Sequence, residues 1–167
     1  MNTQSGRLLI VDDNEMNRDM LARRLERKGY VVGVAEGAQQ LLQRTKQDGT
    51  DLVLLDIEMP GVSGLEALKM LREAYSPIEL PIIMVTAKNQ SEDIVKALDL
   101  GANDYLTKPV DFPVALARIA TQLSHKRAHA AAMALAGSLR NAFPKKESGR
   151  GKGTATRNDC KTAAPIK

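Results

Sequence analysis

The stretch Leu52–Asp56, with the sequence LVLLD, decides how the rest of the chain is interpreted. Four consecutive apolar residues, followed by the turn residues Pro60 and Gly61, are typical of a short strand that is buried on both faces. The run ends in Asp56, which places a carboxylate at the carboxyl end of the predicted strand. Ligands of open parallel α/β sheets bind outside the carboxyl ends of the strands, so Asp56 is a candidate site residue.

Strand-like and helix-like segments alternate on both sides of this stretch. Short apolar runs predict four further strands at residues 8–11, 30–34, 82–85 and 103–106. Apolar residues spaced three or four apart predict helices at residues 14–28, 38–49, 64–74, 91–100 and 112–123. The apolar positions of the first helix are Met16, Met20, Leu21 and Leu25. Five strands alternating with five helices predict an α/β fold with a doubly wound parallel sheet.

Polar side chains follow the other predicted strands at the same end as Asp56. Asp12 and Asp13 follow the first strand, Thr86 follows the fourth and Lys108 follows the fifth. The carboxyl ends of parallel strands lie at one edge of a sheet, so we expect these side chains to meet. Three converging carboxylates repel one another without a cation, and oxygen ligands with room for water and phosphate suit Mg²⁺.

This group of residues predicts a phosphoryl-transfer site. A carboxylate such as Asp56 can attack phosphorus and form an aspartyl phosphate. The transfer requires charge neutralisation more than covalent chemistry from the protein, and Mg²⁺ and the Lys108 ammonium would supply it. The Thr86 hydroxyl can donate a hydrogen bond to a phosphoryl oxygen.

The same residues resemble the receiver domain of two-component response regulators, the CheY-like domain, at Asp12-Asp13, Asp56 with Met59-Pro60-Gly61, Thr86-Ala87 and Lys108-Pro109. Their order, spacing and strand-end positions all match, and the resemblance covers residues 6–124. It implies a flavodoxin-like, five-stranded parallel sheet in the order 2-1-3-4-5.

The resemblance also implies a role for each acidic residue. Asp56 corresponds to the phosphoacceptor and to one of the metal ligands. Asp13 corresponds to the carboxylate that ligates Mg²⁺ directly, and Asp12 to a neighbour that acts partly through water. The backbone carbonyl of Glu58 stands where the family supplies a further metal ligand.

A switch between two states is implied as well. Thr86 corresponds to the hydroxyl that turns toward the phosphoryl group, Tyr105 to the aromatic ring that rotates inward behind it, and Lys108 to the lysine that pairs with the phosphate. The peptide bond between Lys108 and Pro109 is cis in the family. Phosphorylation would shift the population of two states and repack the face around the fourth helix, fifth strand and fifth helix.

The partners that the resemblance implies are a sensor histidine kinase or a phosphotransfer protein, and a downstream effector or output domain. A phosphorylation-dependent homodimer through the repacked face is a further expectation. The protein would not be an enzyme beyond accepting the phosphoryl group and slowly hydrolysing it. No apolar stretch is long enough for a membrane span or a signal core, and the single Cys160 fits a reducing compartment, so we expect a cytoplasmic protein.

The charge distribution divides the chain into an acidic body and a basic tail. Residues 125–167 contain ten Lys or Arg and two Asp or Glu, whereas residues 1–124 contain fourteen and eighteen. Residues 125–136 are rich in Ala and are predicted to be a helical extension or linker, which Gly137 and Pro144 interrupt. Residues 137–167 are predicted to be a flexible, disordered basic tail.

Other functions remain open at this point. The chain could be a free-standing receiver or the front end of a larger regulator whose output domain is absent. Nucleic-acid binding through the basic tail is disfavoured because the tail lacks aromatic residues and a helix-turn-helix pattern. A phosphatase of the haloacid dehalogenase type would need an aspartate at the position of Glu58. His125 and His129 are four apart, but no further ligand lies nearby to complete a metal site.

Overall fold

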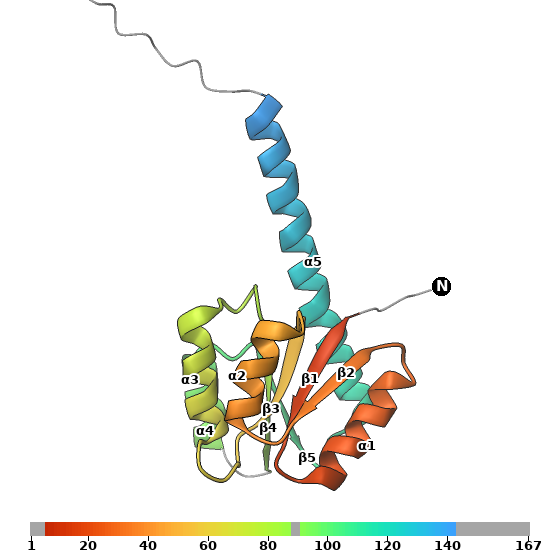
Figure 1. The fold of residues 1–167 in the computed structure, drawn as a ribbon, viewed down its shortest axis with the longest axis vertical. Helices are drawn as coiled ribbons and strands as arrows, with labels where there is room; N and C mark the ends of the chain where they lie inside the picture. Colours follow the sequence, from red (N-terminus) through yellow and green to blue (C-terminus); the bar gives the residue numbers. More distant parts are fainter. Residues whose placement is uncertain (1–5, 88–90, 143–167) are drawn as a thin grey trace, which may run out of the picture.

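A five-stranded parallel sheet forms the centre of the computed structural model, which describes residues 6–87 and 91–142 (Figure 1). The strands lie in the order β2-β1-β3-β4-β5, which confirms the predicted order. Their bounds are β1 Arg7–Val11, β2 Val31–Ala35, β3 Leu52–Asp56, β4 Ile82–Ala87 and β5 Asp104–Lys108. Asp56 pairs with Val85, and Thr86 pairs with Thr107, so the carboxyl ends of the strands share one edge.

Helices cover both faces of the sheet, as a doubly wound fold requires (Figure 1). Their bounds are α1 Glu15–Glu26, α2 Ala38–Gln47, α3 Gly64–Ala74, α4 Ser91–Asp99 and α5 Phe112–Ala142. Helices α1 and α5 pack on one face, and α2, α3 and α4 pack on the other. Strand β3 is fully buried, with Val53 and Leu55 in one apolar cluster and Leu52 and Leu54 in the other. This confirms that LVLLD is buried on both faces.

The buried face of α1 differs from the predicted one. Met16 and Met20 were expected in the apolar face but are 79% and 55% exposed. The buried residues are Arg18, Ala22 and Leu25, of which only Leu25 belongs to the predicted set. The spacing rule failed because the buried row of the helix includes a charged side chain, which hydropathy assigns to solvent.

Helix α5 is longer than predicted, because it continues through Gly137 and ends at Ala142 after 31 residues. The expectation that Gly137 interrupts the helix was therefore wrong. Glycine inside a helix costs stability, about 1 kcal/mol relative to alanine, but it keeps its backbone N–H and can remain helical. The predicted boundary of the tail at residue 137 falls inside α5, and Pro144, Cys160 and the rest of residues 143–167 lie outside the described part.

Only the first part of α5 packs on the sheet. Its buried residues are Ala115, Ile119 and Leu123, and the helix beyond them projects away from the body (Figure 1). Among the described residues, no helix is both long enough and apolar enough to cross a membrane.

Candidate functional site

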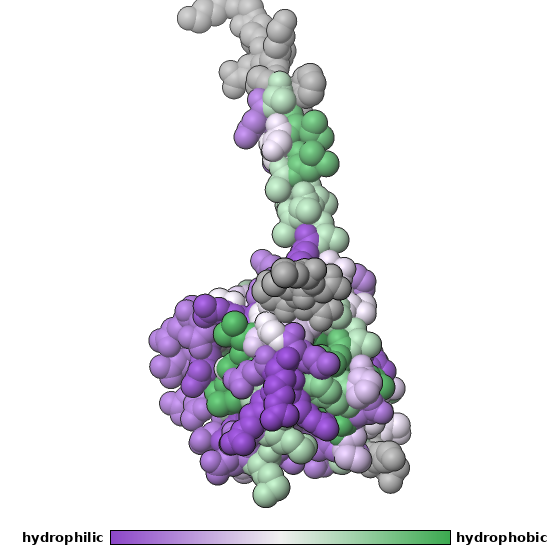
Figure 2. Space-filling view, turned by 90° about the vertical axis from the view of Figure 1, so that its right-hand side faces the viewer, coloured by the Kyte–Doolittle hydropathy of each residue, from purple (hydrophilic) through white to green (hydrophobic). Residues whose placement is uncertain are grey.

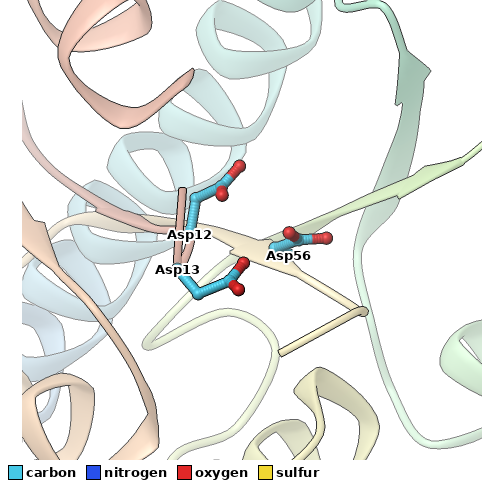
Figure 3. Close-up of side chains that lie close together, drawn as sticks. All are labelled: Asp12, Asp13 and Asp56. Carbon is cyan, nitrogen blue, oxygen red and sulfur yellow. The ribbon is translucent and has the colours of Figure 1, made fainter. Parts of the chain in front are cut away.

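Three carboxylates converge at the carboxyl edge of the sheet, as the sequence predicted (Figure 3). Asp12 and Asp13 come from the connection between β1 and α1, and Asp56 is the last residue of β3. One oxygen from each carboxylate lies within 4.8 Å of the others. Asp12 and Asp56 are buried, whereas Asp13 is exposed. The cluster is therefore held by the sheet edge and is open to solvent on the side of Asp13.

Lys108, the last residue of β5, completes this cluster. Its Nζ atom lies 2.7 Å from Oδ2 of Asp56 and 3.2 Å from Oδ2 of Asp12. Partial burial disfavours the ammonium, yet the two carboxylates outweigh that effect and raise the pKa of Lys108 above its ordinary value. The peptide bond between Lys108 and Pro109 is cis, which confirms what the resemblance implies.

The electrostatic balance of the site favours binding of a divalent cation. Burial raises the pKa of Asp56 above its ordinary value, and hydrogen bonding and charge attraction from Lys108 oppose this effect. Repulsion from Asp12 raises the pKa of Asp56 further. Three carboxyl groups share one ammonium partner, Lys108, and every candidate ligand is a hard oxygen. The donor set of Asp12, Asp13 and Asp56 therefore fits Mg²⁺.

Backbone N–H groups fix the orientation of two of the carboxylates. The N–H of Asn14 donates to Oδ1 of Asp12 at 2.8 Å, and the N–H of Glu58 donates to Oδ1 of Asp56 at 3.2 Å. The second bond holds the segment after β3 against the Asp56 side chain. Glu58 itself is exposed, and its role as a carbonyl ligand stays a prediction.

The N-terminus of α3 packs directly on the backbone of Asp56. The N–H of Gly64 donates to the carbonyl of Ile57 at 2.9 Å. A Cβ atom on Gly64 would lie 2.0 Å from the carbonyl oxygen of Asp56, so this position has room only for glycine. Ser63 and Glu66 form a capping box that fixes the start of the helix. Sequence reasoning missed Gly64, although a glycine that follows a helix-capping serine was the available indication.

Thr86 and Tyr105 lie on the neighbouring strands. Thr86 is fully buried near the end of β4, and its hydroxyl donates to the carbonyl of Ala87 at 3.4 Å. Tyr105 is half-buried on β5 and packs against the apolar cluster of α2, α3 and α4. The guanidinium of Arg118 lies 5.4 Å from the centre of its ring. The switch roles of both residues stay predictions.

Arg18 is a residue of this region that sequence reasoning missed. It lies on the buried face of α1 and is only 7% exposed. Its Nη1 donates to the backbone carbonyl of Asp12 at 2.9 Å, and its Nη2 lies 3.6 Å from a carboxylate oxygen of Glu36. The guanidinium thus ties the connection that carries Asp12 and Asp13 to helix α1. Its spacing of four residues from Ala22 and seven from Leu25, which places all three on one side of a helix, was the available indication.

We expect replacement of Arg18 with methionine to lower the free energy of unfolding by about 2 kcal/mol, because a buried carbonyl loses a charged donor. Urea unfolding followed by circular dichroism measures this loss. Arg23→Met is the matched control, since Arg23 lies on the same helix but is exposed. Equal stability of the two variants would show that the Arg18–Asp12 hydrogen bond contributes nothing.

Comparison with known proteins gives a consistent family assignment. A family model described as the response regulator receiver domain matches residues 8–120. The transcriptional regulatory protein DltR of Streptococcus agalactiae is 46% identical over 113 residues, which are 68% of this chain and 50% of DltR. The alkaline phosphatase synthesis transcriptional regulatory protein PhoP of Bacillus subtilis is 40% identical over 103 residues, covering 62% of this chain and 42% of PhoP.

A solved structure shows the same fold over the body of the chain. The CheY-like response regulator receiver domain protein from Methanospirillum hungatei JF-1 superposes with a TM-score of 0.70 at 32% identity. The match covers 75% of this chain and 99% of that protein. In contrast, the chain spans about half the length of the curated relatives that it matches.

Proposed function

This chain belongs to the response regulator receiver family, and we propose that Asp56 accepts a phosphoryl group from a histidine kinase or a phosphotransfer protein. The observation that carries the proposal is the setting of Asp56 at the edge of the sheet. It combines burial, an ammonium at 2.7 Å and two further carboxylates within 4.8 Å. In a structural role alone, this concentration of buried like charge would cost stability.

The proposed reaction is an in-line phosphoryl transfer. A carboxylate oxygen of Asp56 forms a bond to phosphorus while the bond between phosphorus and the donor histidine breaks, and its electron pair stays on the imidazole nitrogen. Lys108 then pairs with the new phosphoryl oxygens, and Thr86 donates its hydroxyl to one of them. Asp12, Asp13, Asp56 and the Glu58 carbonyl would hold Mg²⁺, which neutralises charge on the transferring group when it is bound.

The proposed output is a change of surface and not a turnover of substrate. The phosphoryl group adds about −1.5 to −2 charges at the end of β3. Thr86 and Lys108 gain partners in only one of two states, which shifts the population toward that state. We propose that Tyr105 follows this shift and that the face of α4, β5 and α5 then binds an effector, an output domain or a second copy. Slow attack by water on phosphorus would restore the Asp56 carboxylate.

The curated relatives DltR and PhoP are named as transcriptional regulatory proteins. This chain covers about half of each relative, so transcriptional regulation is not assigned to this chain from their names. We propose that the chain acts in a two-component pathway in the cytoplasm.

Intact mass spectrometry with acetyl phosphate as donor tests the proposal. With Mg²⁺ present, we expect one phosphoryl adduct per chain, and with excess EDTA we expect none. The same samples are assayed for released phosphate, because a hydrolase of the haloacid dehalogenase type would turn over many donor molecules per chain. Folded wild-type protein that forms no adduct with Mg²⁺ would contradict the proposed function.

A further inference from the structure

The projecting part of α5, residues 124–142, has little contact with the body. Near the start of this part, Lys126 is tied to the body, with its Nζ atom 3.1 Å from Oδ1 of Asp51. Beyond it the helix carries three large apolar side chains in solvent: Met133 is 58% exposed, Leu135 is 63% exposed and Leu139 is 54% exposed. Figure 2 shows that strongly apolar side chains gather along one side of the projecting helix.

The apolar residues of this segment follow the spacing of a coiled coil. A single seam, spaced alternately by four and three residues, consists of Ala128, Ala132, Leu135, Leu139 and Ala142. This alternation places residues along one line of a helix that pairs with another helix. Met133 lies outside the seam, about 160° around the helix axis from Leu135.

The seam faces away from the body of the same molecule. Leu135 and Leu139 each follow a body-facing residue, Ile119 and Leu123, by sixteen positions. At about 100° per residue, sixteen positions turn the side chain by about 160° around the helix axis. The sheet therefore cannot cover the seam, and a second helix laid along it would carry its own body on the far side, without a clash.

The charges of the segment are placed so that two copies do not repel each other. With Leu135 at position d of a heptad, the cations Lys126, Arg127 and Arg140 fall at the outer positions b and c. The e and g positions, where side chains of two paired helices meet, hold neutral or weakly basic residues: His129, Ala131, Ala136 and Ser138. The small residues at Ala128 and Ala132 allow the helix backbones to approach closely.

We propose that the projecting part of α5 pairs in parallel with the same segment of a second copy through this seam. The pairing goes beyond the proposed phosphoryl transfer and does not depend on it, because none of its residues lies near Asp56. It is also a different surface from the face of α4, β5 and α5. A seam of about two heptads is short, so the association is weak and depends on protein concentration.

Sedimentation velocity of the unphosphorylated full chain, over about a hundredfold range of concentration, tests the pairing. Wild type should shift from monomer to dimer as concentration rises. Leu135→Glu should raise the dissociation constant by about a hundredfold or more, because each dimer loses two buried leucines. Met133→Glu is the matched control, since Met133 is similarly exposed on the same helix but lies outside the seam, and this variant should dimerise like wild type.

Disulfide trapping tests the direction of pairing. In a Cys160→Ser background, Leu135→Cys should form a disulfide dimer on mild oxidation, because the two copies of position 135 face each other in a parallel pair. Met133→Cys should not. Wild-type protein that stays monomeric would overturn the pairing, and it would favour an apolar surface of another protein as the partner of the seam. Equal loss in Met133→Glu and Leu135→Glu, or a disulfide only between Leu135→Cys and Leu139→Cys chains, would also overturn it.

Discussion

The Asp56→Asn variant is expected to form no phosphoryl adduct under conditions that fully modify wild type. The amide keeps the shape of the side chain, and its oxygen can still accept the hydrogen bond that the Glu58 N–H donates at 3.2 Å. It has no anionic oxygen to attack phosphorus. Lys108 retains Asp12 as a partner at 3.2 Å, so the variant should fold like wild type.

Stability provides an independent readout for the same variant. Burial raises the pKa of Asp56, so the folded state disfavours the ionised carboxyl. The resulting cost to stability is fully present above the folded pKa, shrinks as pH falls below it, and is gone below the ordinary pKa of an unfolded aspartate. Without Mg²⁺ at neutral pH, thermal unfolding of Asp56→Asn should therefore occur at or above the wild-type midpoint.

The control for this experiment is Asp99→Asn, which removes an exposed carboxylate at the end of α4. It should accept one phosphoryl group, as wild type does. An adduct that persists on Asp56→Asn would place the acceptor on another residue. A variant that unfolds well below wild type would show that the charged pair of Asp56 and Lys108 stabilises the fold.

Among the glycines in the described part of the chain, Gly64 should be the one least tolerant of alanine, and Gly64→Ala should lose at least about 3 kcal/mol in the free energy of unfolding. The added Cβ would lie 2.0 Å from the carbonyl oxygen of Asp56 and 2.7 Å from Cα of Ile57. Both atoms belong to the backbone, so no side-chain rotation relieves the overlap. The start of α3 or the end of β3 must move instead.

Urea unfolding measures the loss, and Gly37→Ala is the matched control. Gly37 also precedes a helix, but its backbone is extended and no atom lies within 4 Å of the added Cβ. Its substitution should cost less than about 1 kcal/mol. Because the displaced backbone carries Asp56, the folded fraction of Gly64→Ala should also accept a phosphoryl group more slowly. A stability within about 0.5 kcal/mol of wild type would contradict the close packing of α3 on β3.

The position of Asp56 could be predicted from the sequence because the information is local. A buried apolar run that ends in a carboxylate defines both the strand and its end, and the parallel topology then brings Asp12, Asp13 and Lys108 to the same edge. The roles of Arg18 and Gly64 could not be predicted in this way. Each depends on a backbone atom of another element, the carbonyl of Asp12 or of Asp56, and hydropathy patterns contain no such distances.

The end of α5 was mispredicted for a different reason. Glycine indicates a helix end only when its backbone takes a left-handed conformation, or when the residues after it no longer follow the helical spacing of apolar residues. Good helix formers lie on both sides of Gly137, with Leu135 and Ala136 before it and Leu139 and Arg140 after it, and their helix propensity outweighs the cost of one glycine.

The continuous backbone of α5 also makes the helix a mechanical lever. The fixed point of this lever is at Ile119 and Leu123, where the helix packs on the sheet. The free part extends about 28 Å from Leu123 to Ala142, at about 1.5 Å per residue. A tilt of about 10° at this fixed point would move the tip by about 5 Å over this length. Repacking too small to alter the outline of the body would thus be amplified into a displacement comparable to one helical turn.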